Sequence, residues 1–235
     1  TRLGGATNSG VLFEYDVITG VYTVKASMDN SIYGYESKNG LIKADNGNLY
    51  GMRSGEGSGL GSIFEYNFST NTISKKADVE YLNCIENGGD GFIYGLTSGT
   101  QINANNFVNG TLFKLDPVTS ATNTIYTFNE KLAFPCCLKK CKNNLFYGLT
   151  YRGGTNNQGT LFEFNPANNL VNKLIDFSTT DGKGPVSILM QASNEKLYAT
   201  TNYGGTNNLG TIFEYRIDGA VYKKMYDFQE GVQTG

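Results

Sequence analysis

The sequence predicts an all-β fold, a β-propeller built from four-stranded antiparallel blades. Three observations lead to it: the composition, a motif that recurs about every 50 residues, and the turn residues that divide each period. The 235 residues include 30 Gly, 16 Tyr and 14 Phe, with 17% charged residues, and aromatic side chains favour pleated strands. No segment shows the 3.6-residue apolar period of a helix. Four short strands per period are typical of one propeller blade.

Two short motifs carry the repeat. The first is Gly, any residue, Leu or Ile, Phe, and then Glu or Lys. Its phenylalanines are separated by 51, 49, 49 and 51 residues: Phe13, Phe64, Phe113, Phe162 and Phe213. The second is an apolar residue, Tyr, and Gly or Ala, at Tyr50, Tyr94, Tyr147 and Tyr198. Because repeat units stack on their neighbours, we expect the five phenylalanines to occupy equivalent buried sites between blades.

Residues 185–228 show the four strands of one period, named A to D from the propeller centre outward. Strand A is the apolar run 186–192, and its continuity predicts burial on both faces. Strand B covers 196–201 and is followed by a Gly/Asn loop. Strand C covers 210–215 with alternating bulky residues, and a tight turn leads to strand D at 220–228.

This period resembles a known repeat family. Residues 149–163 read Leu-Thr-Tyr-Arg-Gly-Gly-Thr-Asn-Asn-Gln-Gly-Thr-Leu-Phe-Glu, and residues 200–214 nearly duplicate them. The pattern resembles the GloVer (Gloeobacter/Verrucomicrobia) tandem repeat of bacterial secreted proteins, and the blade is also similar to a kelch blade. The resemblance covers essentially the whole chain. It implies a β-propeller that is secreted or on a bacterial cell surface, and it supplies no catalytic residues.

The phase of the repeat bears on domain organisation. Residues 1–5 align with the segment that follows a strand B, and Gly235 falls directly before a strand A. The chain then has five C–D hairpins and four A–B hairpins, and the missing hairpin would leave a strand edge uncovered. We expect residues 1–235 to form a single propeller domain or a segment of a longer repeat array. In the first case another chain or unusual pairing would close a five-bladed ring, and in the second the rest of a longer polypeptide would complete the propeller.

The composition excludes several classes of function. The chain has no His, which removes His-based acid–base catalysis, Ser-His-Asp triads and His-ligated metals. A net charge of −2 argues against nucleic-acid partners and anionic membrane surfaces. No stretch approaches the roughly 20 apolar residues of a membrane span, so no membrane insertion is expected. We predict no catalytic residue, no metal site and no cofactor.

The loops between strands B and C are the candidate binding site. Two of them, 153–157 and 204–208, are nearly identical, and they are expected to open on the same propeller face as the D–A loops. Tyr offers a large amphipathic surface and Arg a fork of donors. The candidate contacts for a glycan or protein ligand are Tyr151, Arg152, Asn156, Asn157, Tyr203, Asn207 and Asn208. The alternative is structural, because Gly supplies a positive φ and Asn caps its own loop.

The segment 98–109 departs from the repeat and replaces the Gly-Gly turn. It carries three apolar residues, Ile102, Phe107 and Val108. Departures from a repeat map to loops and often to the binding face. We expect either a partner contact here or packing over the neighbouring blade.

A glutamate follows the strand C phenylalanine in four periods, at Glu14, Glu65, Glu163 and Glu214. A catalytic carboxylate pair would occur once and not in each blade. These residues are therefore expected to form cross-strand pairs with lysines of strand D, such as Lys173 and Lys223.

The four cysteines are Cys84, Cys136, Cys137 and Cys141, all in or near predicted A strands. Their spacing fits a zinc site poorly. Two alternatives remain open. They are buried free thiols, or, in a secreted protein, at least one disulfide forms, with Cys84 bridged to the Cys136–Cys141 cluster.

Taken together, these features favour a non-catalytic binding module, extracellular or at the cell surface, that holds a glycan or protein on its B–C loop face. The alternative is a structural partner or spacer domain within a larger secreted or surface assembly, which the missing hairpin fits. An enzyme has only fold analogy behind it, and fold analogy is a weak warrant.

Overall fold

The computed structural model describes residues 1, 3–34, 36–54, 60–103 and 106–231. The described chain is almost entirely β, with one short helix, α1 (Asn30–Tyr33), capped by the Asp29 carboxylate. It forms two compact units, one of Thr1–Gly95 with Lys114–Asn123 and the other of Leu96–Phe113 with Thr124–Gly235.

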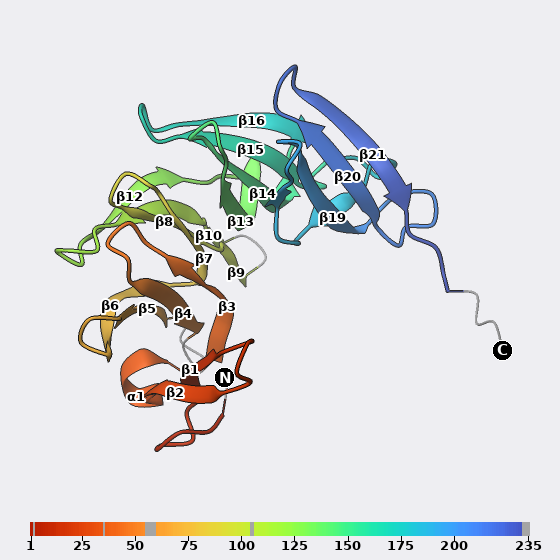
Figure 1. The fold of residues 1–235 in the computed structure, drawn as a ribbon. Helices are drawn as coiled ribbons and strands as arrows, with labels where there is room; N and C mark the ends of the chain where they lie inside the picture. The colour runs from red at the N-terminus through yellow and green to blue at the C-terminus, as the bar shows by residue number, and fades with distance from the viewer. Residues whose placement is uncertain (2, 35, 55–59, 104–105, 232–235) are drawn as a thin grey trace. The chain divides into compact units, whose positions relative to one another are not determined.

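The strands form antiparallel sheets in which consecutive strands are neighbours (Figure 1). A two-stranded sheet of β1 (Val11–Tyr15) and β2 (Tyr22–Ser27) comes first. Four larger sheets follow in chain order. They are β3 (Glu36–Lys43), β4 (Leu49–Ser54), β5 (Leu60–Asn67) and β6 (Thr72–Glu80); β7 (Leu82–Asn87), β8 (Ile93–Thr97), β11 (Thr111–Leu115) and β12 (Thr122–Thr127); β13 (Leu132–Lys140), β14 (Phe146–Gly153), β15 (Thr160–Asn165) and β16 (Leu170–Asp176); and β17 (Lys183–Pro185) with β18 (Met190–Gln191), β19 (Leu197–Tyr203), β20 (Thr211–Arg216) and β21 (Val221–Asp227).

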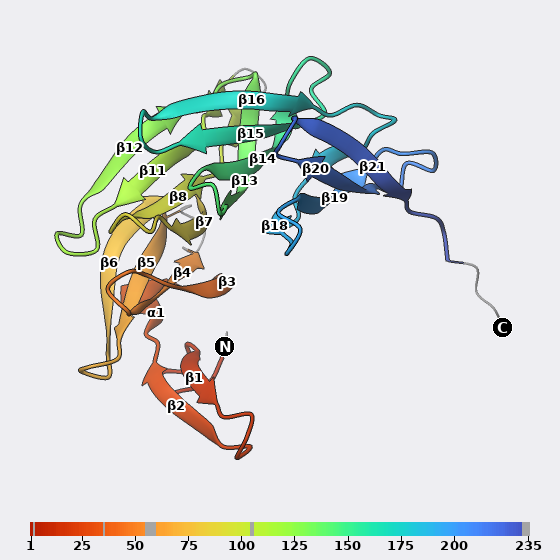
Figure 2. The ribbon, with the colours of Figure 1, turned by 45° about the horizontal axis from the view of Figure 1, so that its top comes forward.

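Each larger sheet has the four strand positions A to D of a propeller blade, which Figure 2 shows clearly for β13 to β16. The all-β fold of four-stranded antiparallel propeller blades is confirmed. The segment after β8 forms a small hairpin of its own, β9 (Thr100–Asn103) with β10 (Asn106–Val108).

Strand A of the last sheet differs from the prediction of one continuous buried strand. Two short pieces, β17 and β18, both pair with β19 in its place. Val186, Ile188 and Met190 are exposed. Between the two pieces, Ser187 Oγ donates to the Thr200 carbonyl and accepts from its N–H. A side chain thus replaces the strand ladder there, and an apolar run alone did not signal it.

The two sequence motifs meet as a cross-strand pair. The strand C phenylalanine lies opposite the small residue of strand B, as Phe64 opposite Gly51, Phe162 opposite Gly148 and Phe213 opposite Ala199. A Cβ on Gly148 would lie 2.2 Å from Cζ of Phe162, so the ring occupies the space above the glycine. The Tyr-Gly motif therefore provides the site for the strand C ring.

The same phenylalanines also contact the preceding blade. Phe128, which follows strand D of one sheet, packs edge-on against Phe162 of the next, with ring centroids 5.3 Å apart. Phe177 stands in the same relation to Phe213 at 5.2 Å. Burial is confirmed for four of the five motif phenylalanines, Phe64, Phe113, Phe162 and Phe213.

Phe13 is the exception, and its predicted burial is wrong. It is 45% exposed. In the described chain its sheet contains β1 and β2 alone, so no Tyr-Gly strand lies beside it. Its ring instead packs on Tyr22, 5.0 Å away.

The tyrosine of one motif also hydrogen-bonds the glutamate of the other. The tyrosine hydroxyl donates to the carboxylate in three sheets, from Tyr50 to Glu65 at 2.5 Å, from Tyr147 to Glu163 at 2.9 Å and from Tyr198 to Glu214 at 2.6 Å. An asparagine four residues earlier donates to each hydroxyl, from Asn46, Asn143 and Asn194. The repeated glutamates thus serve the blade structure.

The predicted lysine partners of these glutamates are correct in two sheets and wrong in two. Glu14 pairs with Lys25 at 3.0 Å and Glu65 with Lys76 at 3.5 Å, both from strand D. In contrast, Lys173 pairs with Asp176. Glu214 pairs with Lys196, at the start of strand B, although Lys223 lies opposite it in register. A lysine stem is long enough to reach more than one strand, so strand register alone did not fix the partner.

We predict that Phe162→Ala lowers the free energy of unfolding by about 3–5 kcal/mol, because it removes a fully buried ring and leaves a cavity. Phe13→Ala is the matched control and should cost under about 1 kcal/mol, since its ring is half exposed. Urea denaturation of both variants measures the difference. Equal losses would contradict the blade alignment.

We also predict acid sensitivity at Glu65. Burial alone would raise its pKa, but hydrogen bonds from Tyr50 and Asn48 and the charge of Lys76 hold the pKa below its ordinary value. A lowered pKa in the folded state stabilises the protein above the unfolded pKa, and this stability is lost as the pH falls through the folded pKa. Glu65→Gln should therefore be less stable than the unmodified protein at pH 7 and equally stable near pH 3. Glu195→Gln, in an exposed ion pair, is the control and should show little difference at either pH.

Candidate functional site

The B–C loops of the last two sheets are built the same way. Asn157 has a φ of 51°, and its Oδ1 accepts from the Gly153 N–H at 3.0 Å. Asn208, with a φ of 56°, does the same for Gly204. Asn tolerates the left-handed region and bonds its own backbone. The structural role weighed for these two asparagines is therefore present in both loops.

Each loop is also anchored to its own sheet at the end where strand D finishes and strand A begins. Thr155 donates from N and Oγ1 to the Asp176 carboxylate, and Thr206 does so to Asp227. Gly154 N donates to the Lys131 carbonyl, just before β13. The B–C loop therefore lies at the same end of its sheet as the D–A connection, as expected.

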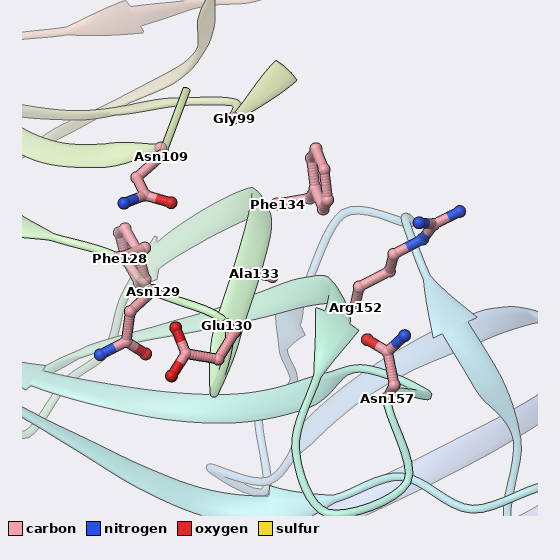
Figure 3. Close-up of a pocket in the computed structure, with 10 residues that line it drawn as sticks. Gly99, Asn109, Phe128, Asn129, Glu130, Ala133, Phe134, Arg152 and Asn157 are labelled. Carbon is pink, nitrogen blue, oxygen red and sulfur yellow. The ribbon is translucent and has the colours of Figure 1, made fainter. Parts of the chain in front are cut away.

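A pocket of about 420 Å³ opens at this end of the β13–β16 sheet (Figure 3). Its walls come from the D–A connection after β12, the start of β13, the end of β14 and the residues before β11. The lining residues are Gly99, Asn109, Gly110, Phe128, Asn129, Glu130, Ala133, Phe134, Arg152 and Asn157. Two of them, Arg152 and Asn157, are among the residues that the sequence predicted.

Arg152 is exposed, and its guanidinium carbon lies 5.7 Å from the centroid of the Phe134 ring and 6.0 Å from that of Tyr151. Within the part of the chain that the structure describes, the guanidinium forms no ion pair. Stacking on aromatic rings orients an arginine while leaving its N–H donors free. Its donors are therefore free to bind an acceptor in the pocket.

The two amides whose bonding is fixed present donors to the pocket. Asn157 Oδ1 accepts from Gly153 N, and Asn129 Oδ1 accepts from Lys131 N. A backbone N–H can only donate, so the facing atom is the oxygen and the free atom is the Nδ2 amine. Figure 3 shows Asn157 below Arg152, and Asn129 with Glu130 on the other side of the pocket. Glu130 contributes a carboxylate that forms no ion pair among the described residues.

The backbone at Phe134 is left-handed, with a φ of 56°. Tyr81 and Gly184 have φ values of 52° and 59° just before or at the start of strand A in their sheets. The blade therefore uses this conformation at the entry to strand A, where a ladder register shift follows at Pro135 to Cys137. A bulky residue is uncommon at such φ values, and here it places an aromatic ring in the pocket.

The predicted partnership of Tyr151 with Tyr203 is not present. Each sheet has a paired threonine in strand B, Thr97, Thr150 and Thr201. Tyr151 follows its threonine by one residue and Tyr203 by two, so the two side chains leave the strand on opposite faces. Tyr151 is half-buried, and a Cβ on Gly184 would lie 2.8 Å from its Cε2. Tyr203 is exposed, with Lys183 Nζ 5.8 Å from its ring centroid.

The remaining predicted residues lie outside this pocket. Asn156 is exposed. Asn207 Nδ2 donates to the Phe228 carbonyl, and Asn207 lines an open hollow of about 640 Å³ with Thr206, Leu209, Asp227, Gln229 and Glu230. The two loops thus border separate depressions.

Sequence reasoning missed Asn129, Glu130 and Phe134. The available signal was a departure from the repeat, since Ser178 and Thr179 follow Phe177 where Asn129 and Glu130 follow Phe128. The predicted contacts Ile102, Phe107 and Val108 have side chains outside the described part of the structure. From that segment, Gly99 and Asn109 line the pocket.

All four cysteines are free thiols in the structure. Cys84, Cys137 and Cys141 are buried, and Cys136 is half-buried with Sγ directed at the carbonyls of Leu149 and Pro185. Of the two alternatives, the structure has the free thiols, and the bridge from Cys84 to the cluster is not formed. Among the described residues, no group of three or more Cys, Asp or Glu side chains could hold a metal ion.

The comparisons with known proteins identify the repeat. The family model of the Gloeobacter/Verrucomicrobia repeat matches residues 80–235, and the chain belongs to this family, which is associated with bacterial proteins. A search of the curated proteins finds no match to the sequence. No helix in the described ranges has the length and apolar character to cross a membrane.

Solved β-propellers share the fold at low identity. TolB from Acinetobacter baumannii is 11% identical with a TM-score of 0.59, over 91% of this chain and 48% of that one. An oligogalacturonate lyase from Vibrio parahaemolyticus is 10% identical with a TM-score of 0.62, over 95% of this chain and 63% of that one. A chain of a nidogen/laminin complex is 12% identical with a TM-score of 0.59, over 94% and 72%. The chain thus spans less than two thirds of TolB and the lyase, and these likenesses extend to the fold alone.

We predict that Asn157→Ala costs about 1–2 kcal/mol of unfolding free energy, because it strains a left-handed residue and leaves the Gly153 N–H without its acceptor. Asn157→Gly keeps the backbone and should cost less. Asn156→Ala, one residue away and exposed, is the control and should change stability by under about 0.5 kcal/mol. Thermal and urea unfolding measure the series, and a neutral Asn157→Ala would contradict the loop-cap role.

Proposed function

We propose that the chain is a non-catalytic binding module that holds a glycan in the pocket at the B–C loop end of the β13–β16 sheet. The observation that carries the proposal is the exposed Arg152, stacked on Phe134 and free of ion pairs among the described residues, at the edge of a cavity of about 420 Å³. That volume falls in the range of small-ligand pockets, about 300–1,000 Å³.

The lining chemistry supports a glycan over a broad protein contact. Amide donors, a carboxylate and an aromatic ring lie in a concave site, and sugars offer many hydroxyls and apolar ring faces to such groups. Rigid strands hold these side chains, because Arg152 is in β14 and Phe134 in β13. The family resemblance supports a location outside the bacterial cell or at its surface.

We predict that the protein retains members of an immobilised oligosaccharide array, and that the Arg152→Ala, Phe134→Gly double variant loses at least ten-fold in affinity for them. The affinity should fall because the variant removes the charged donors and the ring surface that line the pocket. Circular dichroism and thermal unfolding must show that the variant is folded.

Tyr203→Ala is the matched control, because Tyr203 occupies the position of Arg152 in the next sheet and lies outside the pocket. Its affinity should be unchanged. If the unmodified protein retains no oligosaccharide, or if the double variant binds as well as the unmodified protein, the glycan-binding proposal fails and the spacer-domain alternative takes its place.

A further inference from the structure

We infer that this pocket selects an acidic sugar, a pyranose ring that carries a carboxylate, from among the glycans. The inference rests on the proposed function and specifies its ligand. It follows from the separation of donor and acceptor groups around the pocket.

The carboxylate end of the ligand would lie at Arg152. A guanidinium binds a carboxylate through two parallel N–H donors, and those of Arg152 are not engaged by a carboxylate of the described chain. Asn157 lines the same side, and its Oδ1 is already bonded to Gly153 N, so its Nδ2 adds further donors. A group that only accepts hydrogen bonds satisfies this side, and a neutral hydroxyl would leave most of the donors unused.

The hydroxyl end would lie at Asn129 and Glu130. Asn129 presents its Nδ2 donors because its Oδ1 accepts from Lys131 N, and Glu130 presents a carboxylate acceptor. A sugar hydroxyl donates and accepts at once, so it uses both neighbours. An ammonium group would use only Glu130, which favours a hydroxylated ring over the backbone amine or lysine of a peptide.

The ring of the ligand would lie against Phe134, between the two ends. Phe134 is half-buried, comes from the start of β13 and is held by a left-handed backbone. Figure 3 shows its ring above the cavity, between Asn109 and Arg152. An aromatic face of this kind packs on the apolar C–H face of a pyranose.

The blade itself does not require these groups. The position two residues after the paired threonine is Gly99 in the β7–β12 sheet, Arg152 in the β13–β16 sheet and Tyr203 in the last sheet. Glycine, arginine and tyrosine are thus all compatible with the same strand end. The arginine is a departure confined to the sheet that holds the pocket, which indicates a role other than folding.

The test compares binding of matched ligands by isothermal titration calorimetry. The probes are oligosaccharides of galacturonate, glucuronate and mannuronate, each paired with its carboxyl-reduced neutral form. We expect at least one uronate oligosaccharide to bind at least ten-fold more tightly than its neutral partner. Arg152→Gln should remove that preference and leave affinity for the neutral form within two-fold. Phe134→Gly, which retains the left-handed backbone that Gly184 adopts in the last sheet, should weaken both forms.

Each other outcome counts against a stated claim. Equal binding of the acidic and neutral forms, or a preference that Arg152→Gln leaves intact, overturns the acidic-sugar inference while glycan binding stands. A glutamate-rich peptide that binds as tightly as the uronate and competes with it also overturns the inference, because charge alone would then explain recognition. Binding of no oligosaccharide by a folded protein overturns the proposed function as well.

Discussion

The packing of the strand C phenylalanine on a glycine or alanine of strand B is the contact on which the rest of the structure depends. The ring fills the space above Gly51, Gly148 or Ala199, and a larger side chain there would meet it. The same ring then receives an aromatic residue from the preceding blade, as Phe162 receives Phe128. One side chain therefore fixes both the pairing of strands within a sheet and the packing of that sheet on its neighbour. Close-packed interiors tolerate little change of volume, which explains why both motifs recur with so little variation.

The exposed hydrogen-bonding residues of the repeat are also structural for the most part. The glutamates accept from the motif tyrosines, and the loop asparagines accept from loop glycines. Such contacts hold the B–C loops in one conformation at a defined end of each sheet. A rigid loop end then allows a few positions to vary without loss of the fold. Arg152 lies at one such position, and it shows how a repeat protein can add a site to one blade only.

The pocket combines residues that lie far apart in the sequence. Asn109 precedes β11, Glu130 follows β12, Phe134 begins β13 and Arg152 ends β14. Antiparallel strands bring the start of one strand beside the end of the next, so all four reach the same end of the fold. Repeat periodicity predicted that end correctly for Arg152 and Asn157. It gave no weight to Glu130 or Phe134, because each occurs once and stands out only after the blades are aligned in three dimensions.

The sequence by itself determined the fold class, the strand order and the burial of four motif phenylalanines, because a period of about 50 residues repeats the same local pairing of strands. It also placed the candidate loops at the end where strands D and A connect. Tertiary structure decided the rest. Phe13 is exposed because no Tyr-Gly strand lies beside it in the described chain, and a motif cannot specify its neighbour's presence. Tyr151 and Tyr203 look equivalent in sequence, but a one-residue offset from the paired threonine turns them to opposite faces. Side-chain direction in a strand reverses with each residue, so register, which only the folded sheet fixes, decided which residues line the pocket.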